Sequence, residues 1–167
     1  AVACALVGDP ELLFLDEPTT GLDPQARRRL WEVVRAYLDG GGTVVLTTHY
    51  MEEAAQMCDS IAIVDRGRII AEGTPNQLIA SLGAEQVIEF GCEADLVEGE
   101  LTGLDGVQHH ERIDDRHVLR TPNAAATLPG LLSYLGERGI EITDLGTHRA
   151  TLDDVFLHLT GKALRDG

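Results

Sequence analysis

Short apolar runs alternate with amphipathic segments over the first half of the chain. Residues 12–15 (Leu-Leu-Phe-Leu) and 43–47 (Thr-Val-Val-Leu-Thr) each follow a glycine-containing turn, and both are typical of buried strands in a parallel sheet. Between them, apolar side chains recur at helical spacing over residues 30–38, after Asp23 as N-cap and Pro24 at the first helical position. This order of strand, helix and strand predicts an α/β fold.

The pattern changes in the second half. Up to residue 75 we expect a helix and then a two-stranded hairpin around Gly67, and beyond it shorter and more mixed elements. The expected segments are a helix over 51–57, strands over 61–64 and 68–71, a helix over 76–82, a strand over 117–120, a helix over 124–135, a strand over 141–143 and a helix over 152–159. The sequence therefore predicts two domains, a partial α/β core over residues 1–82 and a small α+β domain over residues 83–167.

Residues 85–101 are acidic, with six Asp or Glu and no Lys or Arg. A run of like charge is usually a solvated surface, so we expect one here, with a contact to a partner as the alternative. In the last helix, Val155, Phe156 and Leu159 share one face, and we expect that face to pack on the domain's own sheet or on another subunit.

Composition narrows the classes of function. The 167 residues are 44% hydrophobic and 25% charged, as in globular proteins, and the net charge of −15 argues against a broad basic face for nucleic acid. No apolar run approaches the roughly 18–20 residues that a bilayer span needs. The three cysteines and the group of His109, His110 and His117 fit no disulfide framework or metal-ligand spacing, so we expect structural cysteines in a reducing compartment and no metal at these histidines.

Candidate chemistry lies where the first two strands end. Asp16 and Glu17 directly follow the first strand, and His49 follows the second. Parallel neighbours end at the same edge of a sheet, so these side chains are expected to lie together. Phosphoryl transfer to water needs a carboxylate to hold Mg²⁺ and a group to polarise the water. Asp16 suits the first task, Glu17 the second, and the imidazole of His49 can contact a terminal phosphate.

These residues resemble the ATP-binding cassette (ABC) ATPases over roughly residues 1–80. Residues 12–16 resemble the Walker B strand, Glu17 the catalytic glutamate and His49 the switch histidine. Gly21, Leu22 and Asp23 resemble the D-loop, which in that family lies across the dimer interface near the partner's nucleotide. The resemblance implies the C-terminal half of a P-loop NTPase core, with Asp16 as the residue that holds Mg²⁺ and Asp16, Gly21, Leu22 and Asp23 as the nucleotide-site contacts.

The end of the chain carries a narrower likeness. Residues 152–161 (Leu-Asp-Asp-Val-Phe-Leu-His-Leu-Thr-Gly) resemble the ending of daunorubicin-resistance-type ATP-binding subunits, which serve multidrug and antibiotic exporters. This resemblance implies ATP and Mg²⁺ as cofactors and a second ATPase subunit and a membrane permease as partners. It also implies a cytoplasmic location on the inner face of the membrane, held there by the permease.

Several motifs of the ABC ATPase family are missing from this sequence, and their absence determines the activity that we expect. The phosphate-binding loop needs a lysine after a glycine-rich turn, and the only lysine, Lys162, has no such context. The glutamine loop and the Ser-Gly-Gly signature are also missing, and residues 1–7 have the pattern of a helix end. We therefore expect a C-terminal fragment of an exporter ATPase that is inactive alone. The alternatives are a non-catalytic dimerisation or regulatory fragment and a soluble cassette ATPase of translation or DNA repair.

Overall fold

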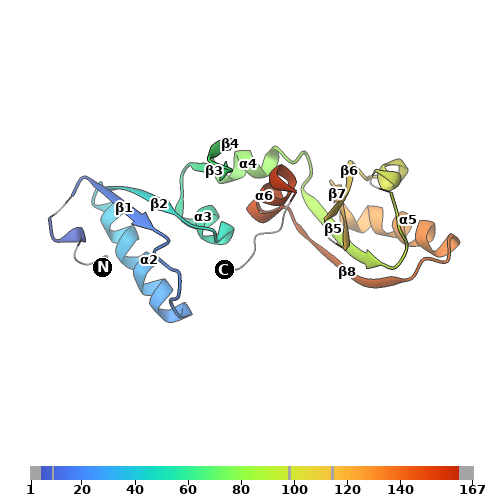
Figure 1. Cartoon of the computed structure of the whole chain (residues 1–167), viewed down its shortest axis with the longest axis horizontal. Coiled ribbons are helices and arrows are strands. Elements are labelled where there is room, and N and C mark those ends of the chain that lie inside the picture. The colour runs from blue at the N-terminus through green and yellow to red at the C-terminus, as the bar shows by residue number, and fades with distance from the viewer. Residues whose placement is uncertain (1–4, 9, 98, 114, 162–167) are drawn as a thin grey trace. The chain divides into compact units, whose positions relative to one another are not determined.

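A computed structural model describes residues 5–8, 10–97, 99–113 and 115–161 (Figure 1). The chain divides into two compact units, residues 1–53 and 54–167. The predicted boundary between residues 82 and 83 is a different division, and it stays a prediction. Most of the expected helix end at residues 1–7 lies outside the described residues. Within the described ranges, no helix combines the length and the apolar character that a membrane crossing requires.

The first unit is a parallel strand pair joined by a helix. Strands β1 (Leu12–Asp16) and β2 (Thr43–Thr47) pair in parallel, from Leu12 opposite Thr43 to Asp16 opposite Thr47. Helix α2 (Pro24–Asp39) connects them and buries Trp31 and Val34. The predicted strands, their parallel pairing and the helix are confirmed.

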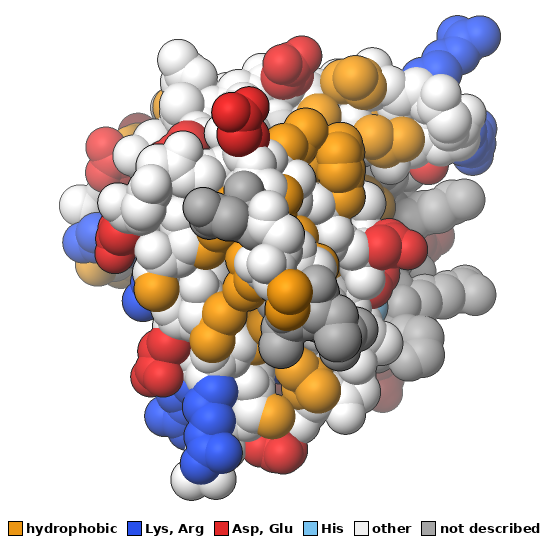
Figure 2. Space-filling view, turned by 90° about the vertical axis from the view of Figure 1, so that its left-hand side faces the viewer, with side chains coloured by type: hydrophobic (Ala, Val, Ile, Leu, Met, Phe, Trp, Pro, Cys, Tyr) orange, Lys and Arg blue, Asp and Glu red, His pale blue; other side chains and the backbone are white. Residues whose placement is uncertain are grey.

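The sequence predicted that both strands are buried. The structure shows that only one face of the strand pair is covered. Leu13 and Leu15 are buried, but Phe14 is 71% exposed and Val45 is 47% exposed. Successive side chains of a strand point to opposite faces, so one face of the pair is covered and the other presents apolar side chains. Figure 2 shows hydrophobic side chains gathered on one face of the molecule.

A helix and a tight hairpin follow. Helix α3 (Met51–Met57) leads to strands β3 (Ile61–Asp65) and β4 (Arg68–Gly73), which pair antiparallel as predicted. Arg66 and Gly67 have φ of 47° and 74°. Two positive φ values between paired strands are characteristic of the type I′ turns that suit hairpins. Helix α4 (Pro75–Ala80) then begins with a capping box between Thr74 and Gln77.

The second unit is built on a four-stranded antiparallel sheet. Its strands lie in the order β6 (His109–Ile113), β7 (Arg116–Thr121), β5 (Gln86–Cys92) and β8 (Ile142–Arg149). The core joins this sheet to helix α5 (Ala124–Glu137) and to a short 3-10 helix (Glu100–Gly103). The core residues are Ile88, Phe90, Leu96, Leu101, Val107, Leu119, Ala124, Leu131 and Leu135.

Sequence analysis did not predict two strands of this sheet. Strand β5 falls in the acidic run, and Val87, Ile88 and Phe90 are fully buried, so the expectation of a solvated surface is wrong for this part. Val87 departs from strict alternation, because it is buried on the face opposite Ile88 and Phe90, the face where the Glu89 side chain lies 3.6 Å from the Arg116 guanidinium on β7. Strand β6 was also missed, and β8 is longer than the expected 141–143.

Helix α6 (Leu152–Thr160) closes the described chain and contacts α4. Its N-terminus has a capping box between Thr151 and Asp154, and Gly161 ends it in the left-handed conformation. Val155 is buried, but Leu159 is 40% exposed, so the predicted three-residue face is only partly covered.

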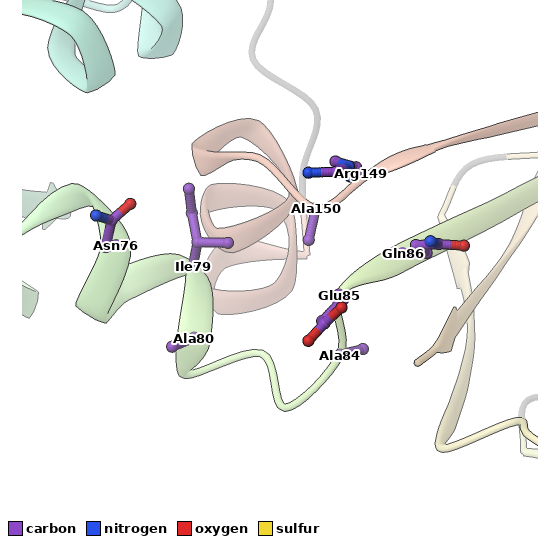
Figure 3. A pocket seen from close by; sticks show the side chains of 8 residues that line it. All are labelled: Asn76, Ile79, Ala80, Ala84, Glu85, Gln86, Arg149 and Ala150. Carbon is purple, nitrogen blue, oxygen red and sulfur yellow. The ribbon is translucent and has the colours of Figure 1, made fainter. Parts of the chain in front are cut away.

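A shallow hollow of about 450 Å³ lies between α4, α6 and the adjoining ends of β5 and β8 (Figure 3). Ile79, Ala84, Glu85 and Arg149 are among its lining residues. It contains none of the residues that sequence analysis assigned to a site.

Candidate functional site

The carboxyl ends of β1 and β2 hold the predicted acidic pair. Asp16 and Thr47 are register partners, and the Thr47 hydroxyl donates a hydrogen bond of 2.5 Å to Asp16 Oδ1. The backbone N–H of Glu17 donates to both the carbonyl oxygen and Oγ1 of Thr47, each at 3.1 Å. Glu17 has φ of 43°, in the left-handed region that non-glycine residues rarely adopt. The β2 strand end therefore fixes the turn that carries Glu17.

Glu17 and His49 meet at this edge. Oε2 of Glu17 lies 2.9 Å from His49 Nδ1, and the Thr20 hydroxyl donates to the same oxygen at 3.3 Å. The ring of His49 packs on Tyr50, with centroids 4.1 Å apart. The side chains of Glu17 and His49 are 38% and 33% exposed, so both are open to solvent on one side. A carboxylate paired with an oriented imidazole can accept a proton from water or orient it.

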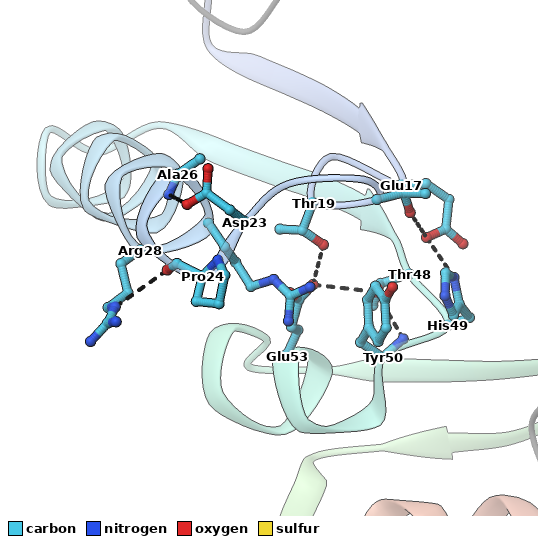
Figure 4. A network of polar contacts seen from close by, with 12 residues as sticks. Glu17, Thr19, Asp23, Pro24, Ala26, Arg28, Thr48, His49, Tyr50 and Glu53 are labelled. Atoms are coloured by element: carbon cyan, nitrogen blue, oxygen red, sulfur yellow. Dashed lines mark hydrogen bonds and ion pairs between the residues drawn. The ribbon is translucent and has the colours of Figure 1, made fainter. Parts of the chain in front are cut away.

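A buried carboxylate ties the loops around this edge together (Figure 4). Glu53, at 7% exposure, accepts hydrogen bonds at Oε2 from the hydroxyls of Thr19 at 2.8 Å and Thr48 at 3.4 Å. Its other oxygen lies 3.3 Å from Nε of Arg27, whose guanidinium also stacks over the Tyr50 ring. This network links the turn after β1, the start of α2, the loop after β2 and the start of α3.

Gly21, Leu22 and Asp23 form the segment that leads from this turn into α2. Gly21 has φ of 75°, where a side chain would be strained. Asp23 is exposed, and its Oδ1 accepts hydrogen bonds from the N–H groups of Gln25 at 2.8 Å and Ala26 at 2.9 Å. The predicted N-cap is confirmed, and it uses one of the two carboxylate oxygens.

Comparison with known proteins identifies the family of this chain. Residues 73–160 match the family described as "ATP-binding protein DrrA1-3-like, C-terminal domain". The chain belongs to the DrrA-like family of ABC ATP-binding proteins. Residues 1–53 also match the family described as "AAA domain, putative AbiEii toxin, Type IV TA system".

Relatives of this DrrA-like chain carry export and resistance names. It is 46% identical, over 96% of its length, to "Daunorubicin resistance ATP-binding protein DrrA3" of Streptomyces coeruleorubidus, of which it covers 51%. It is 43% identical, over 99% of its length, to "Nod factor export ATP-binding protein I" of Cupriavidus pinatubonensis, of which it covers 49%. The chain thus spans about half the length of the curated relatives that it matches. A solved "ATP binding subunit of ABC transporter" aligns with a TM-score of 0.42 at 36% identity, over 45% of this chain and 31% of that one.

In this DrrA-like chain the structure brings Asp16, Glu17 and His49 to one edge, as the sequence predicted from strand order. Sequence analysis missed the polar residues that support them. Nothing in the sequence was a reason to select Thr47, whose place opposite Asp16 follows from the strand register. Sequence analysis assigned no role in a site to Glu53 or Arg27, which form an ion pair at 3.3 Å.

Proposed function

We propose that this chain is the C-terminal part of the ATP-hydrolysing subunit of an ABC-type exporter. The observation that carries the proposal is the 2.9 Å contact between Glu17 and His49 at the edge where Asp16 ends β1. In this assignment Glu17 is the general base for the attacking water, and His49 contacts the terminal phosphate and holds the Glu17 carboxylate in place. The names of the relatives support export as the process that hydrolysis powers.

Asp16 is the proposed Mg²⁺ residue. Its carboxylate is exposed at the strand end, and the Thr47 hydroxyl holds Oδ1 by a short hydrogen bond. Mg²⁺ prefers one or two carboxylates together with substrate phosphates and waters, so a single oriented and open carboxylate fits it. When bound, the ion would neutralise charge on the ATP phosphates.

Gly21, Leu22 and Asp23 are proposed to contact a second ATPase subunit near its nucleotide. Asp23 is exposed, and Oδ2 is not the atom that receives the two cap hydrogen bonds. A cap and an interface contact can therefore share this side chain. The other proposed partner is a membrane permease, which would hold the subunit at the inner face of the membrane.

We further propose that residues 83–167 serve assembly and not the chemistry of hydrolysis. The core that joins α5 to the sheet lies within these residues, which supports a structural role for them. The residues assigned to ATP chemistry all lie between Asp16 and His49.

Replacing Glu17 by Gln in a full-length subunit tests the central assignment. The amide keeps the shape of the side chain but cannot accept the proton, so kcat should fall about 10²–10⁴-fold while ATP binding changes little. Steady-state ATPase assays and a nucleotide-binding titration measure the two effects. The matched control is Glu32→Gln, an exposed glutamate on α2.

Full activity of the Glu17→Gln variant would remove Glu17 from the reaction. His49→Ala should also lower kcat more than it weakens ATP binding, and an unchanged kcat would remove the histidine. Equal losses in Glu32→Gln would show that any charge change on this unit has the same effect.

The 167-residue chain by itself should not turn over ATP. It contains one lysine, Lys162, and no glycine-rich loop before it, so nothing in its sequence supplies the cationic nest that phosphates need next to Asp16 and Glu17. The measurement is phosphate release by the highly purified chain against a blank without protein. Turnover above the blank would contradict this prediction. Absence of turnover in a full-length subunit as well would favour the alternative of a non-catalytic dimerisation or regulatory protein.

A further inference from the structure

Helix α6 and the sheet of the second unit meet across a polar layer. His109 and Glu111 alternate on β6 and so share one face of the sheet, together with Val118 and Arg120, their partners on β7. Glu111 is buried to 13% side-chain exposure, and its Oε1 receives the guanidinium of Arg120, which is 3% exposed. Helix α6 brings His158 to the same carboxylate.

Three potential metal ligands converge there. His109 Nε2 and His158 Nδ1 each lie 3.7 Å from Glu111 Oε2, and the three ligand atoms lie within 4.8 Å of one another. The imidazole rings are nearly perpendicular, with an angle of 81° and centroids 5.7 Å apart. A distance of 3.7 Å is too long for a hydrogen bond. It is close to the separation of about 3.4 Å that two ligand atoms have when each is about 2.0–2.1 Å from one tetrahedral ion.

The surroundings of Glu111 resemble those of a metal-bound carboxylate. Ligands of metal sites are commonly oriented by a second hydrogen bond, and Arg120 provides one to the oxygen that does not face the histidines. His109 and His158 are 44% and 38% exposed, so an ion can enter from solvent and keep a water at its fourth position.

A second group of similar composition differs in one respect. Glu89, His148 and Asp154 also lie close together, but His148 Nε2 is already 3.0 and 3.2 Å from the two oxygens of Asp154. The Asp154 carboxylate also accepts the Thr151 N–H at 2.7 Å and the Thr151 hydroxyl at 2.8 Å. A metal there would have to displace the hydrogen bonds that cap α6, so this group serves as the internal control.

We propose that His109, Glu111 and His158 form a binding site for a transition-metal ion of the Zn²⁺ class, which fastens α6 to β6. Two imidazoles and one carboxylate favour such an ion over Mg²⁺, whose preferred ligands are oxygens. The site is separate from the edge proposed for ATP and does not depend on that function. Sequence spacing could not reveal it, because His158 lies far along the chain from His109 and only the tertiary fold brings them together.

Metal titration of the untagged full chain, after treatment with a chelator, tests the proposal. Zn²⁺ should bind with one ion per chain by calorimetry, in the presence of excess Mg²⁺. Co²⁺ should give the visible bands of a four- or five-coordinate site without the charge-transfer bands that thiolate ligands produce. Zn²⁺ should also raise the melting temperature, because it binds the folded state.

His158→Ala is the decisive variant, since its side chain is on the surface and its loss leaves the Glu111–Arg120 pair intact. We expect Zn²⁺ affinity to fall at least about 100-fold and the rise in melting temperature to disappear, because loss of a direct ligand costs at least as much as loss of a supporting contact. His109→Ala should behave in the same way. The control His148→Ala should keep the affinity of the parent.

Three results would overturn the proposal. The first is a parent that binds Zn²⁺ no more tightly than the variant that lacks both His109 and His158. The second is an equal loss of affinity in His148→Ala. The third is thiolate bands in the Co²⁺ spectrum, which would assign the ion to cysteines.

Discussion

Strand β5 of the second unit and strand β1 of the first unit bury their apolar residues to different extents. In β5 of the second unit, Val87, Ile88 and Phe90 are all fully buried, because α5 covers one face of the sheet and polar partners and α6 line the other. In β1 of the first unit, Leu13 and Leu15 are buried, but Phe14 between them is 71% exposed. An apolar strand therefore has a closed core in one unit and a half-covered core in the other.

The open strand edge of the first unit is also where its proposed chemistry lies. The first unit places open carboxylates and a histidine at the end of a strand pair, as Asp16, Glu17 and His49 show. Buried polar contacts occur in both units, around Glu53 in the first and between His110 and His117 in the second. Adjoining exposed apolar residues can mark a surface that other protein covers, so we expect the face of β1 and β2 that bears Phe14 and Val45 to gain stability when it is covered.

The largest expected effect is from emptying the closed core. Leu131→Ala removes a fully buried side chain of α5 and should lower the free energy of unfolding of the second unit by about 2–5 kcal/mol. Phe14→Ala is the matched truncation in the first unit, and at its exposed position it should cost no more than about 0.5 kcal/mol in this chain.

Amide hydrogen exchange of the 167-residue chain can follow α5 and β1 separately. Similar losses from Leu131→Ala and Phe14→Ala would abolish the contrast between the units. A much larger cost of Phe14→Ala in a full-length protein than in this chain would sharpen it, because it would show that the exposed face becomes covered.

The second expected effect depends on pH and belongs to the second unit. Burial, with a smaller contribution from His117, lowers the pKa of His110 to about 4. Its Nδ1 accepts the Leu101 N–H at 3.3 Å and its Nε2 lies 3.0 Å from Nδ1 of His117, so the neutral ring donates from Nε2. Protonation of His110 Nδ1 would point a second hydrogen at the Leu101 N–H, so the hydrogen bond between them would be lost.

The direction in which stability changes with pH follows from the pKa of His110 in the unfolded and folded states. The unfolded chain binds the proton near the ordinary pKa of 6.5 and the folded chain near 4, so stability is full above about pH 6.5 and falls as the pH drops toward 4. The loss should reach about 3 kcal/mol. Urea unfolding of the parent and of His110→Leu across this range measures it. The variant should lose less stability on acidification, and equal slopes would contradict the assignment to His110.

The smallest effect concerns a helix cap in the first unit. Asp23→Ala removes the acceptor of two backbone hydrogen bonds at the start of α2 and should cost about 1 kcal/mol, whereas Asp23→Asn should keep most of the stability. The fluorescence of Trp31, the only tryptophan and a buried residue of α2, follows the transition. If alanine were as stable as asparagine here, the cap would contribute nothing to the first unit.

The sequence by itself determined the local elements of this protein. The Asp23 cap, the Gly67 hairpin and the helices from α2 to α6 rest on side chains and backbone preferences within a few residues of each other, and these signals are readable from the order of residues. Strand order also sufficed to bring Asp16, Glu17 and His49 to one edge, because parallel strands must end together.

Only the tertiary structure decided which side chains those elements bury and pair. Strand β5 lies in an acidic run, and its Glu89 pairs with Arg116, which lies on another strand. Glu53 became the centre of a buried network because the turns bearing Thr19 and Thr48 converge on it, and His158 reached Glu111 because α6 returns to the sheet. Burial and charge pairing depend on contacts between residues that are far apart in the sequence. The order of residues does not specify those contacts, because they form only in the folded protein.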